Sequence, residues 1–537
     1  MKRQSTTKGF AILSAAGMIA KLVSLIYIPL LQHYVGEDGY GIYYTTYTVF
    51  TFIYVITNTG LSSAISKTVS ELTALKNYKD AAKIFKLARL LLVILGTLMS
   101  VLMLILAKPL SSFIKVPGAY LSIEALAPAI LLTSVASSYR GYFQGRGDMK
   151  ATAVSQILEQ IMNLIFSIFF AALWKKYGVE ATCAGATIGT TVGALASVIY
   201  LLSYYRKNKG YRLPKDYYEI EVHRYSNETL IKKLINCSVP LTISWGLQNA
   251  GGAIDSLYTK RRLLIAGFDD RDGNVRIGYL GKYQMLINLP ITIISALCAA
   301  ILPVVSGAAA RNDREEVKRG IDYAYKTCLL ISIPSAIGLA VLSQPVFNTL
   351  FPTYRAGASL MKYGSIVIVF MAIVQIQATI LQSIGKLYMS TIYIAAGITA
   401  KIILNYTLIA KPNINILGAV FGSMLGFLIP LLLNNFIIKR SLNIKYNLIK
   451  LSVRPFIAAA FMGLVVYLVQ FDVEYLLGFI YKGYITEMLS TVSAIAVGVF
   501  AYLYALILVG GITSKEMEVI PVRLRRYIPN TFLKRIR

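Results

Sequence analysis

The sequence has few charged residues for its length, and this scarcity limits the class of protein. Only 15% of its 537 residues are Asp, Glu, Lys or Arg, whereas soluble domains carry about a quarter. Hydrophobic residues make up 56% and come in long blocks. A soluble globular protein is therefore excluded.

Histidine and cysteine are also scarce, with two and four residues. The cysteines are Cys183, Cys237, Cys298 and Cys328. They lack paired spacing, so they indicate neither a disulfide framework nor a metal site. The two histidines are far apart, which argues against a Ser-His site. A phosphate loop of the GxxxxGK[ST] type is missing, which disfavours ATP hydrolysis by this chain. We expect no metal and no cofactor.

The apolar blocks are long enough to cross a membrane. A helix needs about 20 apolar residues for this, and GFAILSAAGMIAKLVSLIYIPLLQ, which begins near Gly9, is one of many such blocks. Lipid offers the backbone no hydrogen-bond partners, so each span must be a helix or part of a closed barrel. Barrel strands would alternate over about ten residues, and these blocks do not. The sequence predicts an all-α integral membrane protein.

We predict about 14 transmembrane helices from these blocks. The first six are expected near 9–33, 40–65, 84–107, 119–139, 150–174 and 180–204. The next six are expected near 233–258, 279–305, 322–345, 357–383, 388–410 and 416–438, and two more near 453–471 and 486–510.

The basic residues predict the orientation, because Lys and Arg favour cytoplasmic loops. When each is assigned to its nearest loop, 38 of the 54 lie on the side of the N-terminus and 14 on the other side. The remaining two, Lys21 and Lys401, lie inside spans. We expect both termini in the cytoplasm. The net charge of +29 then reflects orientation and contact with anionic lipid, and not nucleic-acid binding.

The chain contains an internal repeat at a shift of 236 residues. Seven of the 28 positions in 43–70 are identical to their counterparts in 279–306, where shared composition alone gives roughly two or three. The copies are offset by six spans, so both enter the membrane from the same side, as in parallel-repeat transporters. Unless these identities are chance, they predict two six-helix lobes around a cavity that opens to each side in turn.

These observations divide the chain into four parts. They are an N-terminal six-helix lobe (1–204), a cytoplasmic linker (205–232), a C-terminal six-helix lobe (233–440), and two extra transmembrane helices with a basic cytoplasmic tail (441–537). The linker is too short for a catalytic or nucleotide-binding domain. The sequence therefore favours a transporter over an enzyme.

Charges inside spans are the first candidates for function, because each costs about 2.5–3.5 kcal/mol on insertion scales. Lys21 lies in the middle of the first span. We expect its ammonium to face the cavity and bind an anionic substrate, and the alternative is a snorkelling or internally paired lysine. Lys401, in the eleventh span, is a second candidate, although its long stem also allows it to reach the membrane interface.

Span five has a polar face. Glu159 shares one side of the helix with Gln156, Gln160 and Asn163, because these residues are three and four apart. This face either lines the cavity or bonds neighbouring helices together. Further hydrogen-bonding candidates within spans are Asn58, Gln284 and Asn288.

Asp255 lies near the outer end of span seven, just before the basic cluster Lys260, Arg261 and Arg262. Its carboxylate either pairs with these bases or binds a coupling proton or sodium ion, and Glu159 is a second candidate for ion coupling. The basic cluster is either a solvated loop or an electropositive outer rim. Arg suits a phosphate-binding rim because its guanidinium donates two parallel hydrogen bonds.

Several of these residues lie in stretches that resemble a known family. The stretches are VGEDGYGIY, GLSSAISKTVSE, RGYFQGRGDMKATAVSQILEQI, DSLYTKRRLLIAG and INLPITIISALCAAILPVVS. They resemble the polysaccharide-transporter branch of the multidrug/oligosaccharidyl-lipid/polysaccharide exporter superfamily. Within it they are most similar to the stage V sporulation protein B group, which is related to MurJ-type lipid II flippases.

The resemblance implies a flippase in the bacterial plasma membrane. Its substrate would be an undecaprenyl pyrophosphate-linked oligosaccharide or peptidoglycan precursor, carried to the outer leaflet through a cationic cavity between two lobes in a V. Lys21 falls where related proteins have a basic residue in the first span, but Tyr27 and Ile28 replace a second Arg of some lipid II flippases. We expect a monomer driven by a proton or sodium gradient or by the membrane potential.

Two other functions stay open. A multidrug or cation antiporter of the same superfamily would share the fold, but would favour a cavity rich in buried carboxylates and aromatic residues. A membrane-embedded glycosyltransferase or polymerase would need catalytic groups on a sizeable outer loop. The largest predicted outer loop, near 259–278, has only about twenty residues.

Overall fold

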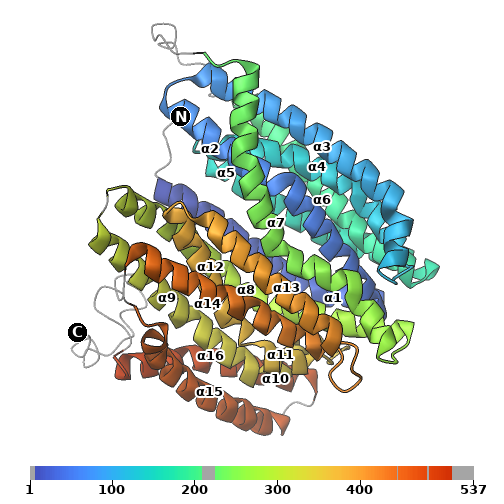
Figure 1. The fold of residues 1–537 in the computed structure, drawn as a ribbon. Coiled ribbons are helices and arrows are strands. Elements are labelled where there is room, and N and C mark those ends of the chain that lie inside the picture. The colour runs from blue at the N-terminus through green and yellow to red at the C-terminus, as the bar shows by residue number, and fades with distance from the viewer. Residues whose placement is uncertain (1–5, 209–223, 312, 444–445, 480–482, 511–537) are drawn as a thin grey trace. The chain divides into compact units, whose positions relative to one another are not determined.

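The computed structural model describes residues 6–208, 224–311, 313–443, 446–479 and 483–510 (Figure 1). All regular structure in these ranges is helical. The middle of the predicted linker and the predicted basic tail after 510 lie outside the described residues.

Within the described ranges, 11 helices are long and apolar enough to cross a membrane, or up to 12 if a bent pair counts as one span. The prediction of about 14 differs for two reasons. The helical stretch Ala15–Ala74 counts once, although it covers two predicted spans, 9–33 and 40–65. The helix over predicted span seven, α7 (Asn227–Ile265), is not among the 11, because its middle contains many polar and small residues.

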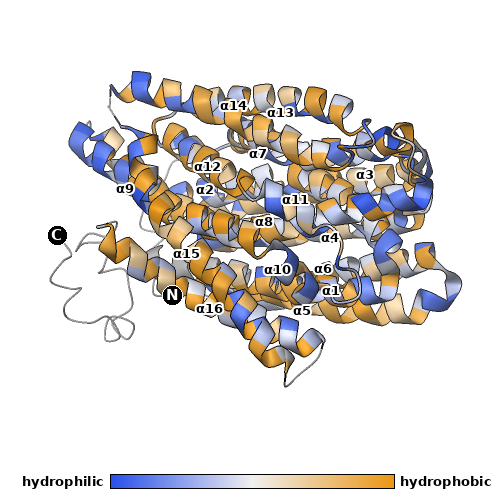
Figure 2. Cartoon of the chain, turned by 90° about the horizontal axis from the view of Figure 1, so that it is seen from below, coloured by the Kyte–Doolittle hydropathy of each residue, from blue (hydrophilic) through white to orange (hydrophobic). Residues whose placement is uncertain are grey.

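Exposed apolar side chains cover the outer faces of these helices, as expected for helices that face lipid. On α3 (Tyr78–Phe113), Leu98 and Ile105 are 59% and 68% exposed. Figure 2 shows hydrophobic residues along the middle of most helices and hydrophilic residues gathered near their ends. Apolar surface of this extent marks a membrane or interaction face in a folded protein. The predicted class, an all-α multi-span membrane protein, is confirmed.

The first helix, α1 (Thr6–Tyr54), consists of two helices joined at a kink. Gly36 has φ 77° and ψ −177° at the kink, a backbone geometry that glycine adopts far more easily than other residues. The predicted break between the first two spans is therefore confirmed in place. A five-residue π-helical turn (Val55–Thr59) then joins α1 to α2 (Gly60–Ala74).

The described helices form two compact units. Unit 1 comprises 1–281 and 401–419. Besides α1, α2, α3 and α7 it contains α4 (Ala119–Gly145), α5 (Met149–Trp174), α6 (Val179–Lys207), the start of α8 (Asp270–Ala310) and the end of α13 (Leu387–Leu408). Two apolar clusters form its interior, one around Leu31 and Ile123 and the other around Phe85 and Leu230. The predicted lobe boundaries stay a prediction.

The C-terminal end of the linker is fixed to the turn between α2 and α3. The fully buried carboxylate of Asp80 accepts hydrogen bonds from Asn77 Nδ2 at 2.8 Å, Arg224 Nε at 3.0 Å and the backbone N–H of Tyr225 at 2.9 Å. A carboxylate with several donors is held firmly, because hydrogen bonds to charged groups are the stronger ones. The chain therefore enters α7 from a defined point on unit 1.

Unit 2 comprises 282–400 and 420–537. It contains the rest of α8 and α13, together with α9 (Arg314–Val341), α10 (Ser343–Leu350), α11 (Ala358–Gly364), α12 (Val367–Ser383), α14 (Leu417–Leu442), α15 (Leu448–Gly478) and α16 (Tyr484–Leu508). The sequence predicted one span over 357–383, but the structure has two helices, α11 and α12, bent by 53°. The predicted extra pair near 453–471 and 486–510 corresponds to α15 and α16.

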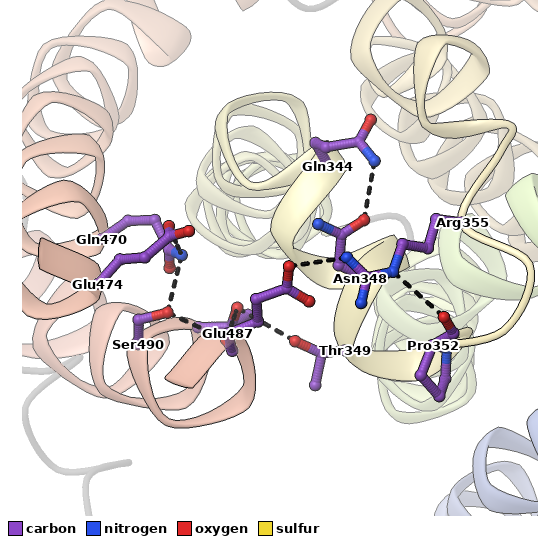
Figure 3. Close-up of polar contacts among 10 residues, drawn as sticks. Gln344, Asn348, Thr349, Pro352, Arg355, Gln470, Glu474, Glu487 and Ser490 are labelled. Carbon is purple, nitrogen blue, oxygen red and sulfur yellow. Dashed lines mark hydrogen bonds and ion pairs between the residues drawn. The ribbon is translucent and has the colours of Figure 1, made fainter. Parts of the chain in front are cut away.

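Polar contacts attach this extra pair to the rest of unit 2 (Figure 3). Arg355 Nη1, outside the pair, donates to Glu487 Oε1 on α16 at 2.7 Å. Within the pair, Gln470 on α15 donates to Ser490 Oγ on α16 at 2.9 Å and joins the two helices to each other. Further along α16, the Tyr502 hydroxyl donates to the carbonyl oxygen of Leu330 on α9 at 2.9 Å. The two extra helices therefore pack as part of unit 2.

Candidate functional site

Lys21 lies on the first half of α1, and its side chain is exposed. At 100° per residue, the exposed Ile26 and Leu30 lie on the other side of the helix, whereas Met18 and Leu22, which are 42% and 57% exposed, lie within about 100° of Lys21. Lys21 forms no ion pair or hydrogen bond with any residue whose side chain the structure describes. Lys21 is therefore an exposed lysine of α1 without a partner among the described side chains, and its role in binding stays a prediction.

Glu159, in contrast, is neutralised by an arginine. Arg140 Nη2, on α4, lies 2.5 Å from Glu159 Oε2 on α5 and 2.8 Å from Ser197 Oγ on α6, while its Nε donates to Ser155 Oγ at 2.9 Å. The Arg140 and Glu159 side chains are only 10% and 17% exposed. The guanidinium therefore connects three helices from one point.

Close packing of α6 against α5 places this pair. Gly185, Gly189 and Gly193 are four residues apart and share one face of α6. A Cβ atom at Gly193 would lie 2.5 Å from the carbonyl oxygen of Glu159, and one at Gly189 would lie 2.7 Å from that of Asn163. Small residues allow such close backbone approach between membrane helices.

The polar face of α5 is used mainly for bonds between helices. Asn163 is buried, and its Oδ1 accepts from Ser167 at 2.8 Å and from Thr190 on α6 at 3.4 Å. Together with the pairing of Glu159, this favours the helix-bonding alternative for these two residues. Gln160 is partly exposed on the same helix.

The other polar candidates occupy different settings. Asn58 lies in the π-helical turn, is fully buried, and donates to Thr133 Oγ1 on α4 at 3.5 Å. Such turns occur frequently at functional sites. Gln284 and Asn288 are partly exposed, four residues apart on one face of α8 in unit 2. Any contact of these side chains with a substrate stays a prediction.

Asp255 is buried in unit 1 and pairs with Lys401. Lys401 Nζ donates to Asp255 Oδ2 at 2.6 Å and to the carbonyl oxygen of Gly251 at 3.4 Å. Asn405 Nδ2 donates to the other carboxylate oxygen at 2.7 Å. The sequence left open whether Asp255 pairs with the bases at 260–262. Its partner is instead a residue 146 positions away, so Lys401 does not reach for the membrane interface.

The basic cluster after Asp255 is largely enclosed. Lys260 is 1% exposed and donates to Asn274 Oδ1 at 2.5 Å, and the Arg262 guanidinium lies 3.8 Å from the ring centroid of Tyr406. Arg261 is exposed. The predicted outer loop at 259–278 is mostly helical, since only 266–269 separate α7 from α8. A solvated loop is therefore the wrong description of this cluster.

Sequence reasoning missed two members of these networks, Arg140 and Asn405. Arg140 was assigned to a loop because the apolar stretch of span four fades near 139, whereas α4 continues to Gly145. The sequence feature that could have marked Arg140 as important is its position in the RGYFQG stretch, which carries the family resemblance. Asn405 follows Lys401 by one helical turn, which could have marked a polar face on the eleventh span.

Comparison with known proteins identifies relatives along most of the chain. Over 436 residues the chain is 25% identical to the stage V sporulation protein B of Bacillus subtilis (strain 168), covering 81% of this chain and 83% of that protein. Over 516 residues it is 24% identical to the lipid II flippase MurJ of the same organism, covering 93% and 94%. The predicted resemblance is confirmed.

Solved structures share the fold. The lipid II flippase MurJ in an inward closed conformation matches 92% of this chain and 98% of its own, with a TM-score of 0.63 and 18% identity. An inward-facing multidrug resistance MATE family transporter of the MOP superfamily matches 80% and 95%, with a TM-score of 0.64 and 17% identity. The family described as polysaccharide biosynthesis protein matches residues 6–309, more than half of the chain, and the protein therefore belongs to that family.

Proposed function

We propose that the protein is a flippase for an anionic, lipid-linked glycan or peptidoglycan precursor, carried on undecaprenyl pyrophosphate. It transfers this lipid from the cytoplasmic to the outer leaflet of a bacterial plasma membrane by alternating access, as a monomer with both termini in the cytoplasm. It changes no covalent bond and is not an enzyme. The names of its relatives, a lipid II flippase and a sporulation protein, support this class of function.

One observation carries the choice of an anionic substrate. The two carboxylates proposed as ion-coupling candidates, Glu159 and Asp255, are each neutralised by a basic partner, Arg140 and Lys401. Lys21 has no such partner among the side chains that the structure describes. The free charge available to a substrate on these helices is therefore positive, and an uncompensated charge inside a membrane marks a functional site.

The same observation disfavours the alternative of a multidrug or cation antiporter. Such a protein needs a buried carboxylate that is free to bind a cation or a proton. In this chain Glu159 already pairs with the Arg140 guanidinium at 2.5 Å, and Asp255 already pairs with the Lys401 ammonium at 2.6 Å. The likeness to MATE transporters shows the fold alone and does not bear on the substrate.

The test is reconstitution of the purified protein into vesicles with labelled lipid II or another undecaprenyl pyrophosphate-linked glycan, under varied ion gradients and potentials. Lys21→Ala should lower the flipping rate about tenfold or more, because a charge-assisted hydrogen bond to phosphate is lost. Lys21→Arg should retain most of the rate. The exposed Lys67 provides the matched control, Lys67→Ala, which should leave the rate unchanged.

Full activity of Lys21→Ala would remove Lys21 from the site. A wild-type protein that flips neither lipid, yet exports cationic drugs from a sensitised host, would establish the antiporter instead. A sugar-transfer product formed by the purified protein would establish an enzyme.

A further inference from the structure

The surroundings of the Asp255 carboxylate have the composition of a site for a small cation. Asp255 is 1% exposed and Lys401 is 8% exposed, so the pair is shielded from solvent. The ammonium lies between two oxygen atoms from α7, Asp255 Oδ2 at 2.6 Å and the Gly251 carbonyl oxygen at 3.4 Å. Carboxylate and carbonyl oxygens are the ligands that hard cations take in proteins.

A further oxygen atom of the Asn405 side chain lies beside the pair without a hydrogen-bond donor of its own. Asn405 Nδ2 binds the Asp255 carboxylate, while Asn405 Oδ1 is buried and has no partner in the part of the chain that the structure describes. A buried polar atom normally has a partner. This oxygen is therefore available to a cation, or to a water bound to one.

The charge balance explains why the ionised carboxylate holds a cation here. An unpaired carboxylate at this depth would be strongly unfavourable, since removing one partner of a buried pair costs about 3–5 kcal/mol. In this chain the cation that neutralises Asp255 is the ammonium of Lys401, which is part of the protein itself and not a bound ion. Asn405, one helical turn further along α13, holds the second carboxylate oxygen at 2.7 Å and fixes the carboxylate plane.

We propose that Asp255, Gly251 and Asn405 form a monovalent-cation site that the ammonium of Lys401 fills. The wild-type protein therefore binds no Na⁺ at Asp255, and removal of the ammonium opens the site to Na⁺. Under the proposed function, this leaves protons or the membrane potential to drive transport. The site itself depends on the structure of unit 1 and not on the identity of the substrate.

The experiment measures Na⁺ binding to the purified full-length protein and needs no substrate. Wild type, Lys401→Ala and Asp255→Asn/Lys401→Ala are compared by ²²Na⁺ binding and by thermal unfolding in NaCl or in N-methyl-D-glucamine chloride. We expect Lys401→Ala to bind about one Na⁺ and to gain about 5 °C in unfolding temperature at saturating NaCl. Wild type and the double variant should bind none and show no Na⁺-specific shift.

Lys401→Met is the matched control. Its side chain fills the space of the lysine stem without a charge, so it should lack both the ammonium and the room for an ion, and should bind less Na⁺ than Lys401→Ala. Recovery of folded Lys401→Ala only when Na⁺ is present throughout purification would also support the proposal.

Two results would overturn it. One is Na⁺ binding by the wild type that Asp255→Asn abolishes, a measurement that does not require Lys401→Ala to fold. The other is folded Lys401→Ala that binds no Na⁺. A protein that fails to flip lipids but shows the expected Na⁺ pattern would contradict the proposed function and leave this site intact.

Discussion

Arg140 and Glu159 form a buried ion pair between α4 and α5, with 2.5 Å between Nη2 and Oε2. Arg140 begins the RGYFQG stretch, and Glu159 lies in SQILEQ. Both segments belong to RGYFQGRGDMKATAVSQILEQI, one of the stretches that carry the family resemblance, and their charged members meet in space. Ser197 of α6 accepts a further hydrogen bond from the same guanidinium at 2.8 Å, so the pair also fixes the third helix of this group.

Removing one member of this pair should destabilise the protein. Arg140→Met or Glu159→Met leaves an uncompensated buried charge and should lower the free energy of unfolding by about 3–5 kcal/mol. The double variant should lose much less, because an apolar pair of similar volume often replaces a buried ion pair without large cost. Thermal unfolding in detergent measures the three variants. Additive losses in the double variant would show that the two side chains do not act as a pair.

The glycine face of α6 gives a second prediction, which concerns packing alone. Gly193→Ala places a Cβ atom 2.5 Å from the carbonyl oxygen of Glu159, so α5 and α6 must separate. We expect a loss of about 1–3 kcal/mol in unfolding free energy. The control is Gly17→Ala on α1, where the Cβ atom meets no neighbouring atom within 4 Å. It should keep or slightly raise stability, since alanine is the better helix former. Equal effects of the two substitutions would refute the close α5–α6 contact.

The attachment of the linker predicts different effects for two acidic residues near the same end of unit 1. Asp80 is fully buried with three donors, whereas Glu71 pairs with Lys233 at 2.7 Å and is 40% exposed. Asp80→Asn should cost about 1–3 kcal/mol because buried donors lose a charged acceptor. Glu71→Gln should change stability by less than about 0.5 kcal/mol. Chemical or thermal unfolding distinguishes the two, and a larger effect at Glu71 would contradict the buried attachment.

The orientation is a further prediction, based on the distribution of basic residues. Because 38 of the 54 Lys and Arg residues lie on the side of the N-terminus, reporters fused to either end should indicate a cytoplasmic location. Green fluorescent protein fused to each end should fluoresce, and alkaline phosphatase should be inactive there. A terminus with the opposite pattern would require an odd number of spans or an inverted insertion.

Much of the fold followed from the sequence by itself. The apolar blocks determined the class, because a backbone in lipid must satisfy its own hydrogen bonds and each block therefore becomes a helix. The break at Gly36 and the extra pair α15 and α16 fell close to their predicted places. Helix ends were less predictable. α4 and α7 continue past their apolar stretches, and this extension hid Arg140 and gave 259–278 the appearance of a loop.

The tertiary structure alone decided which charges are neutralised. Spacing along a helix shows which residues share a face, but it does not show which other helix will cover that face. Asp255 pairs with Lys401, 146 residues away, and not with the bases that follow it at 260–262. Glu159 pairs with Arg140 because α4, α5 and α6 pack closely enough for one guanidinium to reach them all. Lys21 remains unpaired among the described side chains, and this contrast exists only once the helices have assembled.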